Sequence, residues 1–186
     1  MHSATQYAKV IPMHIIIDGY NLIRQSDSMR RYERQSLEAG RQALISRLIE
    51  YKRKKGHKIT VVFDGWDKGS AMEERDRQGS IGIIYSCRGE KADDVIKRLA
   101  DHSSEEAVVI SSDREIASYV TRRGKTSLSS PEFEMLMFKA IAQSAGSDFA
   151  VKEEDDDGTN HHSSKKGPAK RMSRAQRHAQ TKIRKL

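Results

Sequence analysis

The stretch HIIIDGYN, residues 14–21, sets four residues suited to a buried strand directly against an Asp, a Gly, a Tyr and an Asn. Its three consecutive isoleucines are typical of a strand that is covered on both faces, as in a parallel sheet. An ionised carboxylate that follows such a strand is costly to desolvate unless it finds a partner. The other strands of the chain decide which groups Asp18 meets.

Similar apolar runs recur along the chain, and segments with apolar residues at three-to-four spacing separate them. The runs are residues 59–63 (ITVVF), 81–86 (IGIIYS) and 107–111 (AVVIS), with a short fifth strand at 125–128. The helical segments are 32–55, 91–101, 113–123 and the segment that starts at 130. This alternation predicts an α/β fold, a three-layer parallel sheet with right-handed crossovers.

Charge is spread unevenly over the 186 residues. The chain has 34 Lys and Arg against 26 Asp and Glu, a net charge of +8, but residues 151–186 hold ten of the basic and only five of the acidic residues. The remaining 150 residues are close to neutral. The basic excess therefore lies in the tail, which suggests a polyanionic partner such as nucleic acid.

The composition divides the chain into three parts. Residues 1–12 are predicted to be a short N-terminal extension, residues 13–146 the folded domain, and residues 147–186 a tail that is acidic and then basic. The tail has too few apolar residues to build a core, so it is predicted to be disordered and to become helical over 172–185 on binding.

Cellular location follows from what the sequence lacks. Cys87 is the sole cysteine, which excludes a disulfide framework and fits a reducing compartment. No apolar run approaches the roughly 18–20 residues of a membrane span, and residues 1–12 lack the apolar core of a signal peptide. We expect a cytoplasmic protein with no membrane partner.

Acidic residues follow the predicted strands. Asp18 follows the first strand, Asp64 the second, and Asp113 the fourth, while Asp93 begins the helix after the third. Because ligands gather at the carboxyl ends of parallel strands, these side chains are expected at one edge of the sheet.

A group of carboxylates at one edge repels itself, and a bound divalent cation is the usual relief. An oxygen-only set suits Mg²⁺ or Mn²⁺, whereas zinc would be expected to draw His or Cys. Such ions activate water and stabilise charge at phosphorus, so the chemistry indicated is phosphodiester hydrolysis.

Each acid also has a simpler use. Asp18 and Asp64 both precede a glycine and suit turns. Asp93 lies in the first turn of a helix, where a carboxylate gains roughly 0.3–1 kcal/mol from the helix dipole. Asp113 follows Ser112 inside an S-x-x-E capping box. Their coincidence at one edge nevertheless favours a metal site.

Four motifs in a fixed order resemble a known family. They are DGYN at 18–21, VVFDG at 61–65, GEKADDVI at 89–96 and VVISSD at 108–113. Together they are similar to the YacP-like branch of the NYN domains, relatives of the PIN-domain nucleases, over roughly residues 13–145. The resemblance implies a PIN-like α/β fold with a metal-dependent ribonuclease site built from acidic residues.

The resemblance also implies roles for individual residues. Asp18 and Asn21 match the first motif, Asp93 matches the E-x-A-D helix start with Glu90 in the Glu position, and Asp113 with Ser112 matches the end of the fourth strand. We expect a catalytic set of Asp18, Asn21, Asp93 and Asp113. The expected metal ligands are Asp18, Asp93, Asp113 and Asp64.

Substrate contacts are expected near the same edge. In the polar loop 66–80, Lys68, Arg75 and Arg77 are candidates to contact phosphates, and Trp66 is a candidate to stack on a base. Ser112 is expected to orient substrate or water. A solvated charged loop and a partly buried tryptophan anchor are the alternatives.

The expected function is that of a metal-dependent endoribonuclease that acts on mRNA or other cellular RNA. The basic tail, Lys165 to Lys185, is expected to add salt-sensitive affinity for RNA, including ribosomal RNA. The alternative is a non-catalytic RNA-binding module of the same fold. A phosphatase is disfavoured because no D-x-D follows the first strand, and a nucleotide switch because no phosphate-binding loop motif occurs. A DNA substrate and the oligomeric state stay open.

Overall fold

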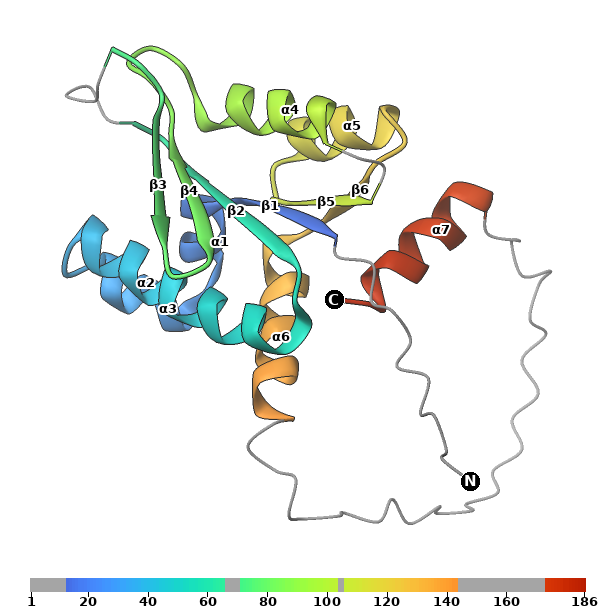
Figure 1. The fold of residues 1–186 in the computed structure, drawn as a ribbon, viewed down its shortest axis with the longest axis horizontal. Coiled ribbons are helices and arrows are strands. Elements are labelled where there is room, and N and C mark those ends of the chain that lie inside the picture. The colour runs from blue at the N-terminus through green and yellow to red at the C-terminus, as the bar shows by residue number, and fades with distance from the viewer. Residues whose placement is uncertain (1–12, 66–70, 104–105, 144–172) are drawn as a thin grey trace, which may run out of the picture.

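The computed structural model describes residues 13–65, 71–103, 106–143 and 173–186. Within them the strands form one sheet in the order β3-β4-β2-β1-β5-β6. Their bounds are β1 His14–Asp18, β2 Lys58–Phe63, β3 Glu74–Gln78, β4 Ile81–Tyr85, β5 Ala107–Ile110 and β6 Thr126–Leu128. The predicted α/β fold is confirmed, including the short strand near residue 126 (Figure 1).

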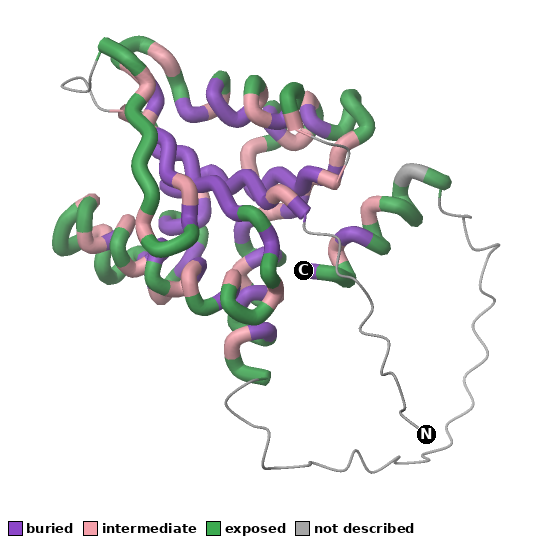
Figure 2. Tube along the Cα trace, in the orientation of Figure 1, coloured by how far each residue is buried: buried purple, intermediate pink, exposed green. Residues whose placement is uncertain are grey.

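The sheet is mixed rather than fully parallel, because β3 pairs antiparallel with β4 while the other described pairings are parallel. Residues 74–78 were predicted as part of a polar loop, and that prediction is wrong. The sequence ERDRQ has no apolar residue that would mark a strand. It is stabilised at the sheet edge by backbone pairing, and its side chains stay largely exposed (Figure 2).

The helices match the predicted segments with three differences. Their bounds are α1 Gly19–Gln25, α2 Asp27–Glu33, α3 Leu37–Lys55, α4 Ala92–His102, α5 Arg114–Arg122, α6 Ser130–Ala142 and α7 Arg174–Ile183. The segment predicted as one helix from residue 32 begins instead at Leu37, because Ser36 caps α3 by accepting from the Ala39 N–H. Helix α1 was missed, since Asp-Gly suggested a turn, and α2 was not predicted. None of the described helices is long and apolar enough to cross a membrane.

The sheet separates two apolar layers. Ile15, Ile17, Val61 and Phe63 point to the side covered by α1, α2, α3 and α6, and the residues between them, such as Ile16, point to the side covered by α4 and α5 (Figure 1). This alternation of side chains along each strand determines on which side of the sheet the acids lie. Continuing the alternation, Asp18 and Asp64 fall on the side of α4 and α5.

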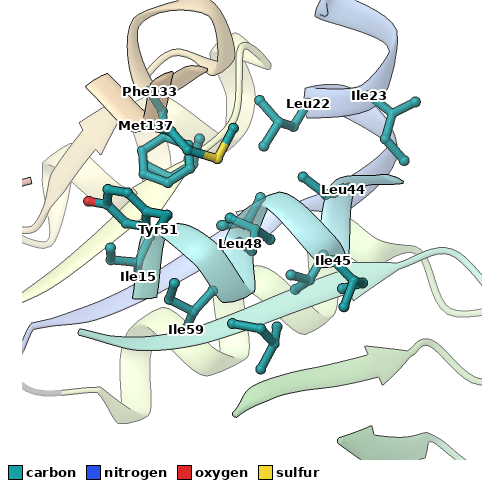
Figure 3. Close-up of a cluster of buried hydrophobic side chains, with 14 of the residues drawn as sticks. Ile15, Leu22, Ile23, Leu44, Ile45, Leu48, Tyr51, Ile59, Phe133 and Met137 are labelled. Atoms are coloured by element: carbon teal, nitrogen blue, oxygen red, sulfur yellow. The ribbon is translucent and has the colours of Figure 1, made fainter. Parts of the chain in front are cut away.

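The larger layer is built around long side chains from α3 and α6 (Figure 3). Tyr51 and Phe133 meet edge to face with their ring centroids 5.5 Å apart, and both are fully buried. Leu48, one turn before Tyr51, is also fully buried. Burying a side chain of this size contributes about 1.5–3 kcal/mol, so this layer fixes α3 and α6 on the sheet.

The C-terminal segment folds onto the larger layer, and this changes the prediction of a disordered tail. Residues 144–172 and 1–12 lie outside the described residues. Residues 173–186 form α7 and end in a buried Leu186, whose carbonyl accepts from the Tyr51 hydroxyl at 2.9 Å. The prediction of disorder is wrong for this stretch because Ile183 and Leu186 supply an apolar contact that composition alone obscured.

We expect Tyr51→Phe to lower the free energy of unfolding by about 1 kcal/mol, because it removes a buried hydrogen bond and leaves the Leu186 carbonyl without that donor. Tyr32→Phe is the matched control, since Tyr32 is 44% exposed. Urea denaturation measures both. Equal stability of the two variants would show that α7 is not held by this bond.

Candidate active site at the carboxyl edge of the sheet

Asp18 is the last residue of β1, a central strand of the sheet, and it is buried. It lies on β1, between β2 and β5, and only 9% of it is exposed. Burial raises the pKa of Asp18 to about 6, against the effect of its hydrogen bonds, and the nearby carboxylates of Asp93 and Asp64 raise the pKa further. A carboxyl with such a pKa exchanges a proton close to neutral pH.

Both oxygens of Asp18 have donors. Oδ1 accepts from the Asn21 N–H at 3.1 Å, which makes Asp18 the N-cap of α1, and Oδ2 accepts from the Ser111 hydroxyl at 3.1 Å. The Ser111 oxygen in turn accepts from the Asp113 N–H at 3.1 Å. Ser111 therefore connects two of the predicted acids. It was not predicted, although its place at the end of AVVIS, in register beside Asp18, was a usable signal.

Asp64 reaches the first turn of α4. Its Oδ1 accepts from the Ala92 N–H at 2.6 Å, and Lys91, the residue at the cap position, makes no side-chain capping bond. Asp64 therefore caps a helix that begins 28 residues later. The turn after it is tight, because a Cβ on Gly65 would lie 1.9 Å from the Ser86 carbonyl oxygen. Only glycine fits there.

Asp93, in the first turn of α4, is half-buried among the other acids. Burial raises its pKa, and the carboxylates of Asp113, Asp64 and Glu115 act in the same direction. Lys97 opposes them, and its ammonium lies 2.5 Å from the Glu115 carboxylate. Asp93 thus lies where charges from α4, the start of α5 and the end of β2 meet.

Asp113 begins α5. Its Oδ1 accepts from the N–H groups of Glu115 at 2.6 Å and Ile116 at 3.3 Å, so Asp113 is the N-cap. The capping box considered for Ser112 is therefore wrong. Asp18, Asp64, Asp93 and Asp113, here named the acidic edge, come from separate elements and influence one another's charge.

The acidic edge offers a divalent cation only carboxylate oxygens as donors. Within the described residues, no three His, Cys, Asp or Glu side chains have the spacing of a preformed metal site. Asp18, Asp64 and Asp113 each accept a hydrogen bond from a backbone N–H through Oδ1. Oδ2 of Asp64 and Oδ2 of Asp113 take part in none of the described hydrogen bonds. Carboxylate oxygens with mutual repulsion suit Mg²⁺ or Mn²⁺. The donor atoms therefore fit such an ion in their chemistry.

Asn21 bridges three parts of the fold. Its Oδ1 accepts from the Ser112 N–H at 2.9 Å and from the Ser130 hydroxyl at 2.8 Å. The Ser112 hydroxyl accepts from the Ser130 N–H at 3.1 Å. Asn21 and Ser112 thus lie next to the acidic edge as predicted, but their described bonds hold α1, β5 and α6 together.

The residues predicted to contact substrate do not gather at the acidic edge as the acids do. Trp66 and Lys68 lie outside the described residues. Arg75 pairs with Glu73 at 2.7 Å, and Arg77 pairs in register with Gly82, toward the amino end of β4 and away from the acids. The expected group of cations over the acidic edge is therefore not assembled by the described residues of this loop.

Glu90, in the Glu position of the third motif, forms an ion pair with Arg98. Arg98 also holds Glu73, which ties the start of β3 to α4. The guanidinium is the largest cause of the lowered pKa of Glu90. This carboxylate is thus engaged in an ion pair beside the start of α4.

Comparisons with known proteins show which family the chain matches and which solved structures share its fold. The pattern that describes the YacP-like NYN domain matches residues 15–185. A protein of Bacillus subtilis (strain 168), "Uncharacterized protein YacP", is 29% identical over 86 residues, which is 46% of this chain and 50% of the relative. The match therefore spans about half the length of that relative.

Two solved structures have a similar fold. Rae1 (YacP) from Bacillus subtilis aligns with a TM-score of 0.58 and 23% identity, covering 70% of this chain and 76% of that one. A mutant of the same Bacillus subtilis protein aligns with a TM-score of 0.60 and 22% identity, covering 70% and 78%. The matched pattern extends through α7, so the C-terminal helix falls inside the region that the family shares.

We expect Asp18→Asn to stabilise the protein at pH 7.5 but not at pH 4. The folded-state pKa of Asp18, about 6, exceeds its ordinary value of 3.8, so the folded protein holds this proton more tightly. Stability is then lost as the pH rises from about 4 to 6, by about 2 kcal/mol. The amide cannot ionise and avoids that loss.

Denaturant titrations of the wild type and Asp18→Asn at both pH values measure the difference. A second readout is the carboxyl resonance of Asp18 in the folded wild type. A stability difference that is the same at pH 4 and pH 7.5 would contradict the raised pKa.

Asn21→Ala should lower the free energy of unfolding by about 1–3 kcal/mol, because it leaves the Ser112 N–H and the Ser130 hydroxyl without their acceptor. Asn21→Asp keeps the acceptor oxygen and is the control for loss of that atom. Thermal denaturation distinguishes them. If Asn21→Ala were as stable as the wild type, the bridging role would be wrong.

Proposed function

Because the chain belongs to the YacP-like NYN domain family, which resembles the PIN-like nucleases, we propose that it is a metal-dependent endoribonuclease. The proposal is that the acidic edge hydrolyses phosphodiester bonds in mRNA or other cellular RNA in the cytoplasm. The observation that carries it is the burial of Asp18 beside Asp93 and Asp64, at the carboxyl end of parallel strands.

The acids of the acidic edge would hold the cation. Asp18, Asp93 and Asp113 are the proposed ligands, with Asp64 as a further oxygen donor. When bound, Mg²⁺ or Mn²⁺ supplies an activated water and offsets the charge that develops at phosphorus. The repulsion among these carboxylates disfavours their joint ionisation without a cation, which supports the assignment.

The surrounding residues hold the acids in place. Ser111 donates to Asp18 and accepts from the Asp113 N–H, so it keeps two acids oriented. Asn21 fixes the loop that carries Ser111, through the Ser112 N–H. Lys97 lies beside Asp93 and is proposed to contact a substrate phosphate, releasing Glu115 when it does so.

A non-catalytic RNA-binding module is the competing function. A pure binder gains nothing from four acids that face a polyanion, because like charges repel. The burial of Asp18 also costs stability at neutral pH, as the raised pKa implies. A buried carboxyl that lowers stability at neutral pH is better explained by a catalytic role than by binding alone.

Cleavage of single-stranded RNA with Mg²⁺ or Mn²⁺ tests the proposal. We expect Asp18→Asn and Asp93→Asn to lower the cleavage rate by about 100-fold or more, the scale for removing a group that stabilises developing charge. Asp27→Asn is the matched control, since its side chain is 99% exposed on α2. EDTA should abolish cleavage.

A second readout does not depend on activity. Mn²⁺ should raise the melting temperature of the wild type but not of Asp18→Asn or Asp93→Asn, because a ligand that binds only the folded state stabilises it. Single-stranded DNA of the same sequence belongs in the assay, to decide between the two polymers. No cleavage of either polymer with any added metal would refute the nuclease assignment.

A further inference from the structure

The end of α3 and the end of α7 lie together at the amino ends of the strands (Figure 1). His57, just after α3, is fully buried, and its Nε2 donates to the Lys185 carbonyl oxygen at 3.2 Å. The Tyr51 hydroxyl donates to the carbonyl of Leu186. Two segments that are 128 residues apart are thereby joined into one surface.

This surface is rich in cations. Its basic side chains, here named the basic pole, are Arg53, Lys54, Lys55, Lys58, Arg184 and Lys185. All are exposed except Lys55, which is half-buried. Burial lowers the pKa of His57, and the charges of Lys55 and Lys185 lower it too, so side chains from both segments lie near the same ring. The hydrogen bond between His57 and the Lys185 carbonyl thus brings the cations of the two segments to the same end of the sheet.

The cations of the basic pole have no acidic partners among the described residues. The ion pairs among the described residues are made by basic residues outside the pole, such as Arg24, Arg41, Lys97 and Arg98. Lys52, next to the pole, has a lowered pKa, caused first by burial and then by Arg77 and Lys58. Like charges are thus gathered without neutralisation, which costs stability.

The helix dipole does not account for this charge. Each helix C-terminus carries roughly half a negative charge, so the ends of α3 and α7 together offset about one of the six positive charges. An external polyanion matches an exposed cluster of this sign.

We propose that the basic pole is a docking surface for the phosphate backbone of RNA, separate from the acidic edge. The two lie at opposite ends of the strands. β1 has five residues, so about 17 Å of sheet separates them. A short RNA held at the acidic edge does not reach the pole, whereas a long RNA can contact both. The choice of RNA over another polyanion rests on the proposed function.

Binding to a single-stranded RNA of about 30 nucleotides, several times the length one small site covers, tests the docking surface. The full chain carries Asp18→Asn so that the RNA stays intact. Adding Lys54→Gln, Lys55→Gln, Arg184→Gln and Lys185→Gln should weaken binding about 10-fold or more and lower the slope of log affinity against log salt by about 2–3. The Lys185 carbonyl, which holds His57, is unchanged by the substitution.

The control removes charge elsewhere. Arg31→Gln with Arg34→Gln on α2 changes two exposed cations without affecting a described ion pair, and it is compared with Lys54→Gln plus Lys55→Gln. We expect only the second pair to weaken binding. Equal weakening by both pairs, or no weakening by the fourfold variant, would overturn the docking surface. Binding to anionic vesicles with the same dependence on the pole would overturn RNA as its partner.

Different results would refute the proposal of catalysis and the proposal of docking. With Asp18 intact, the fourfold variant should cleave a pentanucleotide at the wild-type rate and long RNA more slowly at the same concentration. If the wild type cleaves nothing but the pole still binds RNA, the nuclease proposal fails and the docking surface stands. If the fourfold variant loses cleavage of the pentanucleotide while keeping its melting temperature, the pole belongs to the active site and the separation is wrong.

Discussion

The burial of the Asp18 carboxyl at the end of a central strand is the constraint on which the site depends. The group loses most of its hydration, and the protein returns two hydrogen bonds, one from the Asn21 N–H and one from the Ser111 hydroxyl. These donors come from α1 and from the end of β5, so satisfying one carboxyl fixes the relative positions of two segments that are far apart in sequence. The raised pKa shows that the compensation is incomplete.

Structural and chemical uses of the acids coexist. Asp18, Asp64 and Asp113 each accept from N–H groups at the start of a helix, a capping role that differs from the turn and first-turn roles that the sequence suggested for them. A capping bond holds one oxygen of a carboxylate in a set direction, and the helix beyond it is packed on the sheet. Capping therefore orients the acids in advance, which is what a metal or charge-stabilising site needs.

The sequence was sufficient for the described strands other than β3, for their parallel core and for the meeting of the acids, because apolar runs and strand ends are local signals with a fixed geometric consequence. It was insufficient for features that depend on tertiary contacts. β3 is stabilised by pairing with β4 and shows no pattern of its own. α7 depends on two apolar residues at the end of a polar segment, and Ser111 gains its role only from lying in register beside Asp18.

The distribution of charge along the strands has a consequence for how a polyanion approaches. A chain that carries acids at one end of its strands and cations at the other has a dipole that would turn its basic pole first toward a polyanion such as the proposed RNA. The acidic edge repels phosphate until its charge is offset, so a cation at the edge would control productive contact as well as chemistry. If both proposals hold, affinity and catalysis would change independently, since salt would weaken the basic pole by screening while divalent ions would act on the acidic edge.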